Sequence, residues 1–254
     1  MKTHLLLDIE GTTCPFNFVV DVLFPYAEKN LEPFVEAHYN EDTIKKILAQ
    51  ANEEWIKDKR PDSISLLSRC YRQSHTSKES TTKYLQYLMS IDQKSTALKD
   101  LQGKIWGQGY KNGALKSTLF EEAHECIHRW KEKGLILAVY SSGSVEAQKM
   151  LYQHTQTGNL AGLFSHWFDT HTGPKKSQES YELIAKEIGT DAKNFIFISD
   201  NREECDAAKI AGMQTLFSLR ANNPNQDPRQ HCVISDLNEV DAYIFKNPRA
   251  KKIS

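Results

Sequence analysis

Short runs of consecutive apolar residues, each ending in a polar side chain, form the most regular pattern in this chain. Three runs are prominent: HLLLD at 4–8, LILAVYSS at 135–142 and NFIFISD at 194–200. Two weaker ones follow, QTLFSLR at 214–220 and CVISDL at 232–237. Runs that are apolar throughout, without alternation, favour strands of a parallel sheet that is covered on both faces.

Segments with helical periodicity separate these runs. The stretch 117–134 starts with Thr118 and Glu121 at the spacing of a capping box, and 144–154 starts with Ser144. The stretches 176–189 and 202–212 each end in glycine. Strands alternating with helices predict an α/β fold, a Rossmann-like doubly wound parallel sheet.

The segment 21–110 has a different pattern, with four helical stretches and no convincing strand. We expect an inserted α-helical domain at 21–110, with 1–20 and 111–254 forming the α/β core domain. Its aromatic residues Tyr84, Tyr87 and Trp106 are expected in the core of a small helical bundle. The glycines and asparagine of 109–116 predict a hinge.

The composition limits the kinds of molecule that this chain is expected to bind. The 254 residues include 32 Lys and Arg against 33 Asp and Glu, which gives no reason to expect a nucleic acid or a membrane as partner. The five cysteines are scattered, without zinc-binding spacing, and are expected to be reduced thiols. No run has the length of a signal peptide or a membrane helix, so we expect a cytoplasmic protein. We also expect a monomer.

Polar residues end the three prominent strands: Asp8 the first, Ser141 and Ser142 the second, and Asp200 the third. In an open parallel sheet, ligands bind at the carboxyl ends of the strands. One aspartate after a strand is ordinary turn chemistry, but three strands ending in this way indicate a shared site.

Asp8 and Asp200 brought together would repel each other unless a cation lay between them. Two carboxylates, a main-chain carbonyl and water oxygens make the octahedral site that Mg²⁺ prefers. The histidines do not form a competing cluster; His124 and His128 lie one helical turn apart without an evident third ligand, and are expected to be structural.

The turn after the first strand reads DIEGTT. Asp8 is the group closest to the expected metal, and Glu10 is a candidate acid or base. Gly11 would allow a tight turn whose N–H groups face an anion. Thr12 fits a hydroxyl donor to the same anion and a turn cap equally well.

Further candidates lie downstream. In GPKKSQESY, either Lys175 or Lys176 would neutralise a phosphate, although adjacent lysines are usually at the surface. Glu204, one helical turn after Asp200, would hold metal-bound waters or complement the helix dipole.

Asp8, Glu10, Ser141, Lys175 and Asp200 together resemble the four motifs of the haloacid dehalogenase-like hydrolases. Within that family the strings DIEGTT and YSSGSVEAQK are most similar to the acireductone synthases, the enolase-phosphatases of methionine salvage. The resemblance covers nearly the whole chain, including the helical insert, and implies an α/β core with an inserted helical cap.

The resemblance also implies residue roles. Asp8 would be the nucleophile that forms an aspartyl phosphate, with Glu10 as the second acid. One Mg²⁺ per chain would be held by Asp8, the main-chain carbonyl of Glu10 and Asp200. Substrate-binding and catalytic groups downstream would be Ser141, Ser142 and Lys175.

The implied substrate is a small phosphorylated diketone, 2,3-diketo-5-methylthiopentyl-1-phosphate, which the enzyme converts through an enol to the acireductone and phosphate. The nearest alternative is another Mg²⁺-dependent phosphatase of the same family that acts on a different small phosphoester. Two other classes are less favoured. In a dehalogenase Glu10 would have no catalytic role, and in a binding protein without catalytic activity the free-energy cost of burying these carboxylates would serve no function.

Overall fold

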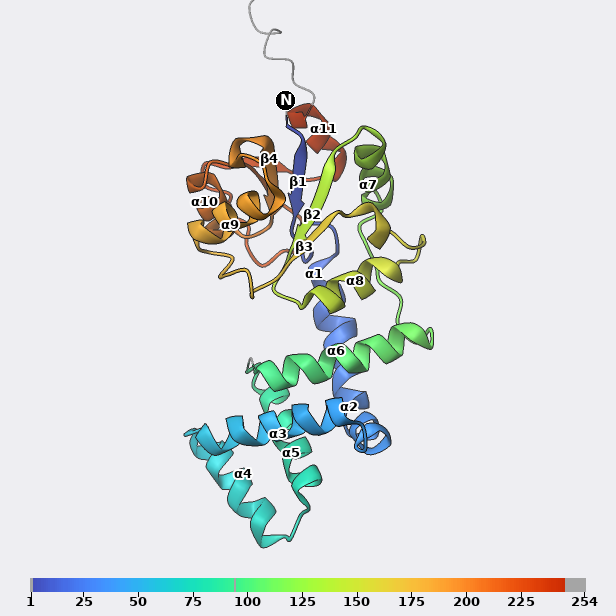
Figure 1. The fold of residues 1–254 in the computed structure, drawn as a ribbon, viewed down its shortest axis with the longest axis vertical. Coiled ribbons are helices and arrows are strands. Elements are labelled where there is room, and N and C mark those ends of the chain that lie inside the picture. The colour runs from blue at the N-terminus through green and yellow to red at the C-terminus, as the bar shows by residue number, and fades with distance from the viewer. Residues whose placement is uncertain (1, 94, 245–254) are drawn as a thin grey trace, which may run out of the picture. The chain divides into compact units, whose positions relative to one another are not determined.

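The computed structural model describes residues 2–93 and 95–244, and its chain divides into two compact units, 1–20 with 116–254 and 21–115 (Figure 1). The second boundary lies five residues beyond the predicted 110. Leu115 is buried, and its N–H donates to Gly109 O at 2.9 Å, which ties the segment after the last helix to the helical unit. Whether 109–116 is a hinge stays a prediction.

The first unit is built on one parallel sheet of six strands, in the order β3-β2-β1-β4-β5-β6. The strands are β1 (His4–Leu7), β2 (Ile136–Tyr140), β3 (His166–Phe168), β4 (Phe195–Ser199), β5 (Gln214–Ser218) and β6 (Cys232–Ile234). All five predicted strands are confirmed. The edge strand β3 was not predicted, because its residues His166 and Trp167 are only half-buried and its segment has no unbroken apolar run.

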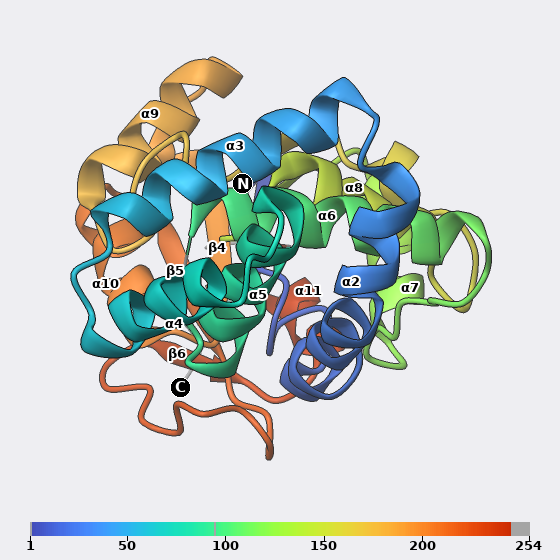
Figure 2. The same cartoon turned by 90° about the horizontal axis from the view of Figure 1, so that it is seen from below.

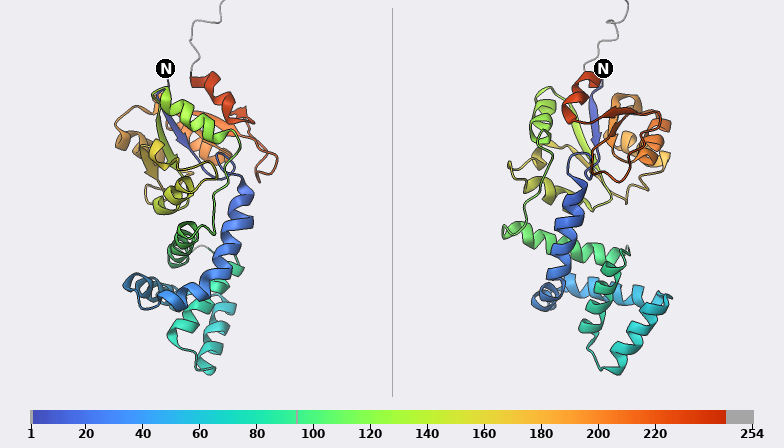
Figure 3. Two further views of the ribbon diagram at one scale, coloured as in Figure 1. Left: turned by 90° about the vertical axis from the view of Figure 1, so that its right-hand side faces the viewer. Right: turned by 180° about the vertical axis from the view of Figure 1, so that it is seen from behind.

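Helices cover both faces of the sheet, as its apolar strands require. They are α7 (Ala123–Glu132), α8 (Val145–Gln153), α9 (Gln178–Ile188) and α10 (Arg202–Ile210), with the short α1 (Phe16–Phe18) and α11 (Asp241–Ile244). Figures 1 and 3 show α9 and α10 on one face and α7 and α8 on the other. Leu6 and Phe197 share a buried cluster with Tyr181 of α9 and Cys205 of α10. The predicted doubly wound α/β core is confirmed.

One predicted helix start is wrong. α7 begins at Ala123 and not near Ser117, so Thr118 and Glu121 do not form a capping box. Residue 117 instead pairs with the segment after α8: Ser117 N donates to His154 O at 2.9 Å. A long-range backbone pairing therefore overrides a local helix-start signal. The starts of α8 and α10 lie where the sequence predicts them, and Ser144 caps α8 by accepting from Ala147 N.

The second unit is entirely helical. It contains α2 (Phe24–His38), α3 (Asp42–Lys57), α4 (Pro61–Arg72), α5 (Ser77–Ser90) and α6 (Thr96–Lys111), preceded by a π-helical turn at Val19–Leu23. α3 packs against α5 and α6 (Figure 2). Trp55 stacks on Tyr84 with ring centroids 4.9 Å apart, and Tyr87 and Trp106 pack against the same core. The aromatic residues thus form a helical core, as predicted.

The five cysteines are free thiols, as the sequence indicates. Among the described residues, no helix combines the length and the apolar character needed to cross a bilayer.

Candidate active site

Three adjacent strands deliver polar side chains to one edge of the sheet. β1 pairs in parallel with β2 on one side and β4 on the other. Because the three strands are parallel, the residues that follow them emerge at the same edge. These residues, Asp8, Ser141 and Asp200, are 4%, 1% and 8% exposed. The structure therefore brings the predicted residues together in a buried polar site.

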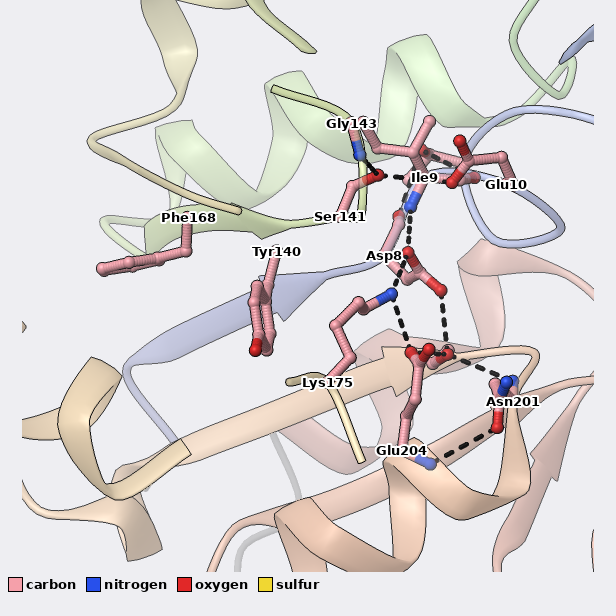
Figure 4. Close-up of polar contacts among 12 residues, drawn as sticks. Asp8, Ile9, Glu10, Tyr140, Ser141, Gly143, Phe168, Lys175, Asn201 and Glu204 are labelled. Carbon is pink, nitrogen blue, oxygen red and sulfur yellow. Dashed lines mark hydrogen bonds and ion pairs between the residues drawn. The ribbon is translucent and has the colours of Figure 1, made fainter. Parts of the chain in front are cut away.

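The carboxylate of Asp8 is held at both oxygens (Figure 4). Oδ1 accepts from Ile9 N at 2.8 Å and from Lys175 Nζ at 2.7 Å. Oδ2 accepts from Ser199 Oγ at 2.9 Å. A carboxylate bound in this way has one fixed orientation, which is what a positioned nucleophile requires.

Lys175 and not Lys176 belongs to the site. Its ammonium lies 2.7 Å from Asp8 Oδ1 and 2.7 Å from Glu204 Oε2, and its side chain is 9% exposed. Burial alone would lower the pKa of Lys175, but the charges of Asp8 and Glu204 outweigh it and raise the pKa above its usual value. Lys176 is exposed and pairs with Glu203 at the surface.

Ser199 and the pairing of Glu204 with Lys175 were not predicted. Ser199 Oγ lies 2.9 Å from Asp8 Oδ2 and 3.0 Å from Glu204 Oε2, and so links the two carboxylates. Burial and the charge of Asp8 raise the pKa of Glu204. A single hydroxyl at the end of the apolar run NFIFISD was the signal available in the sequence.

Glu10 faces the loop that follows β2 (Figure 4). Ser141 Oγ donates to Glu10 Oε2 at 3.3 Å. Burial and the charge of Asp8 raise the pKa of Glu10, which favours the protonated acid. Ser142 is exposed in the same loop, and neither Asp8 nor Glu10 hydrogen-bonds to it in the described part of the chain.

Because residue 11 is a glycine, the turn after β1 leaves room for the side chain of Asp200. Its φ is +69°, a left-handed conformation that glycine adopts readily, and a Cβ there would lie 2.3 Å from Asp200 Oδ2. Ser218 Oγ and Asn223 Nδ2 both donate to Gly11 O, at 2.8 and 2.9 Å. The turn is therefore held by side chains that are distant from it in the sequence. The carboxylate of Asp200 occupies the space that a side chain at residue 11 would fill.

The expectation that N–H groups of this turn face an anion is wrong for three of them. Gly11 N donates to Cys14 O, while the N–H groups of Thr12 and Thr13 both donate to Ile9 O. The turn satisfies these donors internally. The hydroxyl of Thr12 is buried and has no hydrogen-bond partner within 2–93 and 95–244, so its role as a turn cap is not supported.

The donor set of the site fits Mg²⁺. Four acids, Asp8, Glu10, Asp200 and Glu204, lie near the ammonium of Lys175. Burial, followed by the charges of Asp8 and Glu204, raises the pKa of Asp200 to about 8. A divalent cation would relieve this repulsion, and carboxylate oxygens are the ligands that Mg²⁺ prefers.

The described residues hold no group of three or more His, Cys, Asp or Glu side chains in a metal-binding arrangement. The ligand set predicted from the sequence has only two side-chain carboxylates, those of Asp8 and Asp200. Its third ligand is the main-chain carbonyl of Glu10. His124 and His128 lie on α7 with their ring centroids 4.6 Å apart and their ring planes tilted by 53°.

Comparison with known proteins agrees with this geometry. A model of the haloacid dehalogenase-like hydrolases matches residues 3–212. The chain is 54% identical over 242 residues to an Enolase-phosphatase E1 of Parasynechococcus marenigrum, covering 95% of this chain and 99% of that protein. It is 43% identical to the protein of that name from Aquifex aeolicus, covering 87% and 91%.

The fold is also similar to solved structures. The UTR4 protein of Saccharomyces cerevisiae superposes with a TM-score of 0.73 at 30% identity, covering 93% of this chain and 98% of that one. The HAD-hydrolase YfnB of Bacillus subtilis, bound to magnesium, has a TM-score of 0.56 at 14% identity, covering 97% and 100%, and shares the fold alone. The chain therefore belongs to the haloacid dehalogenase-like hydrolases and, within them, to the Enolase-phosphatase E1 family.

Proposed function

We propose that this chain is a phosphatase of the acireductone synthase type, which converts 2,3-diketo-5-methylthiopentyl-1-phosphate through its enol to 1,2-dihydroxy-3-keto-5-methylthiopentene and phosphate in methionine salvage. Relatives with 43–54% identity that bear the name Enolase-phosphatase E1 support the substrate. The observation that carries the chemistry is the Asp8 carboxylate, presented by the central strand β1 and fixed at both oxygens.

Asp8 attacks phosphorus, so that an Asp8–phosphorus bond forms while the bond from phosphorus to the substrate oxygen breaks. Glu10 is the acid that protonates the departing oxygen, which agrees with its raised pKa. The resulting Glu10 carboxylate then takes a proton from the water that attacks the aspartyl phosphate and frees Asp8. Dividing the hydrolysis in this way replaces one difficult step by two easier ones.

Lys175 and the loop after β2 bind the phosphoryl group. The Lys175 ammonium already contacts Asp8, so it lies where negative charge accumulates during transfer. Ser141 and Ser142 donate hydroxyl groups to the phosphoryl oxygens and the substrate. One Mg²⁺ per chain, held by Asp8, the Glu10 carbonyl and Asp200, would offset the repulsion between carboxylate and phosphoryl group. A cytoplasmic location and a monomeric state remain predictions from the sequence.

Incubation with the diketo phosphate and Mg²⁺ tests the proposal, with phosphate release and ultraviolet absorbance of the enediol followed together. We expect both signals in the wild type and neither in Asp8→Asn with its circular dichroism unchanged. Lys176→Ala is the matched control for Lys175→Ala, because only Lys175 reaches the site. Phosphate release without the enediol would indicate a different phosphoester, and full turnover by Asp8→Asn would exclude Asp8 as nucleophile.

A further inference from the structure

The loop that carries Lys175 is held by three buried hydroxyl groups. It lies between β3 and α9, and three successive carbonyls each accept one hydroxyl. The bonds are Tyr140 OH to Gly173 O (2.9 Å), Ser180 Oγ to Pro174 O (2.8 Å) and Tyr181 OH to Lys175 O (2.7 Å). This set, here called the hydroxyl clamp, comes from two regular elements, β2 and α9.

The clamp donors are rigid. Tyr140 and Tyr181 are fully buried, and Ser180 is 2% exposed. The two tyrosine rings pack edge to face with centroids 5.5 Å apart, and Tyr181 packs on Phe197 at 5.0 Å. Burial raises the pKa of both phenols, which keeps them protonated and therefore hydrogen-bond donors. Donors fixed in this way restrict the backbone they bind.

The loop has a glycine where the clamp approaches most closely. Gly173 has φ +149°, and a Cβ at this position would lie 2.3 Å from Ser180 Oγ. The serine hydroxyl therefore occupies the space that any larger residue at 173 would need, and it reaches Pro174 O from there. Loop and clamp are complementary in shape as well as in hydrogen bonding.

Lys175 is thereby fixed at both ends. Its carbonyl is bound by Tyr181, and its ammonium contacts Asp8 and Glu204. The ammonium also lies 5.8 Å from the centre of the Tyr140 ring, beside which its side chain runs (Figure 4). Tyr140 directly precedes Ser141, so the end of β2 carries one phosphate-binding residue and holds the loop that carries another.

We propose that Tyr140, Ser180 and Tyr181 are positioning residues that set the place of Lys175 for phosphoryl transfer. This inference rests on the proposed role of Lys175. A displacement of about 1 Å in a catalytic group costs on the order of 10²-fold in rate, so releasing one carbonyl of the loop has a measurable effect.

Tyr181→Phe removes one oxygen atom and keeps the ring packing. We expect kcat for phosphate release to fall about 10-fold or more, with KM changed less than about 3-fold, because the loss is in the transition state. Tyr84→Phe is the matched control, since Tyr84 is also a buried tyrosine with a bonded hydroxyl but lies in the helical unit. It should lose similar stability and keep wild-type kcat.

Tyr140→Phe and Ser180→Ala remove the other two hydrogen bonds, one from β2 and one from α9. Each should lower kcat in the same way, so either variant can serve as the test if Tyr181→Phe folds poorly. In a Lys175→Ala background, Tyr181→Phe should cause no further fall, because the clamp acts through the lysine. Wild-type kcat in all three clamp variants, or an undiminished further fall in that background, would overturn the inference. Full activity of Lys175→Ala itself would instead overturn the proposed role of Lys175.

Discussion

Replacing Gly11 by alanine separates a backbone effect from an effect on the site. The residue has φ +69° in the turn after β1. A residue with a Cβ loses about 1–2 kcal/mol in the left-handed conformation. For a chain of this size that corresponds to a fall in Tm of roughly 2–8 °C.

The new methyl group would also meet Asp200. The Cβ would lie 2.3 Å from Asp200 Oδ2, 2.6 Å from its Cγ and 2.8 Å from Asn223 Nδ2. The carboxylate must move by about 1 Å to reach an ordinary contact distance, and such a displacement costs on the order of 10²-fold in rate. We therefore expect Gly11→Ala to lose at least about 10²-fold in phosphate release and to need more Mg²⁺ for half-maximal rate.

Gly134→Ala is the matched control. Its φ is +79°, nearly that of Gly11, but a Cβ there would meet no atom of the described residues within 4 Å, apart from its own chain neighbours. It precedes β2 at the edge of the sheet opposite the site. Thermal unfolding should show the backbone loss for Gly134→Ala and at least as large a loss for Gly11→Ala, and kinetic assays should show wild-type activity for Gly134→Ala alone. If both variants keep the same activity, Asp200 is not confined by Gly11 and the reasoning fails.

Three further predictions follow from other contacts. Asp58→Asn should lower the unfolding free energy by about 2–3 kcal/mol at pH 7, because the buried Asp58 carboxylate accepts from Arg60 and Tyr84. Arg60 lowers the pKa of Asp58, so this stabilisation is fully present above the unfolded-state pKa of about 3.9 and is lost as pH falls from there through the lower folded-state pKa. Urea unfolding should therefore show a smaller difference between the two proteins at pH 3 than at pH 7. Thr76→Ala removes the capping box of α5 and should cost about 1 kcal/mol in thermal unfolding, with kcat unchanged. EDTA should abolish phosphate release and excess Mg²⁺ restore it, whereas Asp200→Asn should need at least about 10-fold more Mg²⁺, and activity in EDTA would contradict the metal site.

Strands β1, β2 and β4 could be predicted because each has a strong local pattern. The residues of β1 and β4 are all buried, so burial on both faces leaves an unbroken apolar run in the sequence. β3 has only three residues, of which His166 and Trp167 are half-buried. Such an edge strand depends on pairing with β2, which no local pattern records.

Lys175 and Lys176 differ in a way that the local sequence cannot predict. The two residues are chemically identical neighbours, and one is buried against Asp8 while the other is exposed. The difference comes from the path of the loop, which is set by hydroxyl groups of β2 and α9. In the sequence Tyr181 appears only as one more core aromatic, and its hydroxyl bond to the Lys175 carbonyl depends on the tertiary fold.

The acids at the edge of the sheet were predictable because parallel topology alone brings strand ends together. Their charge balance follows from the contacts. Lys175 forms its direct ion pairs with Asp8 and Glu204, and the described residues show no ion pair of Asp200 or Glu10. Burial, followed by the charge of Asp8, raises the pKa values of Asp200 and Glu10, and the more distant charge of Lys175 offsets this only in part. Glu10 is neutral when it carries the proton that it is proposed to donate. Asp200 has no proposed role as an acid, so we infer that a divalent cation balances the charge of its carboxylate.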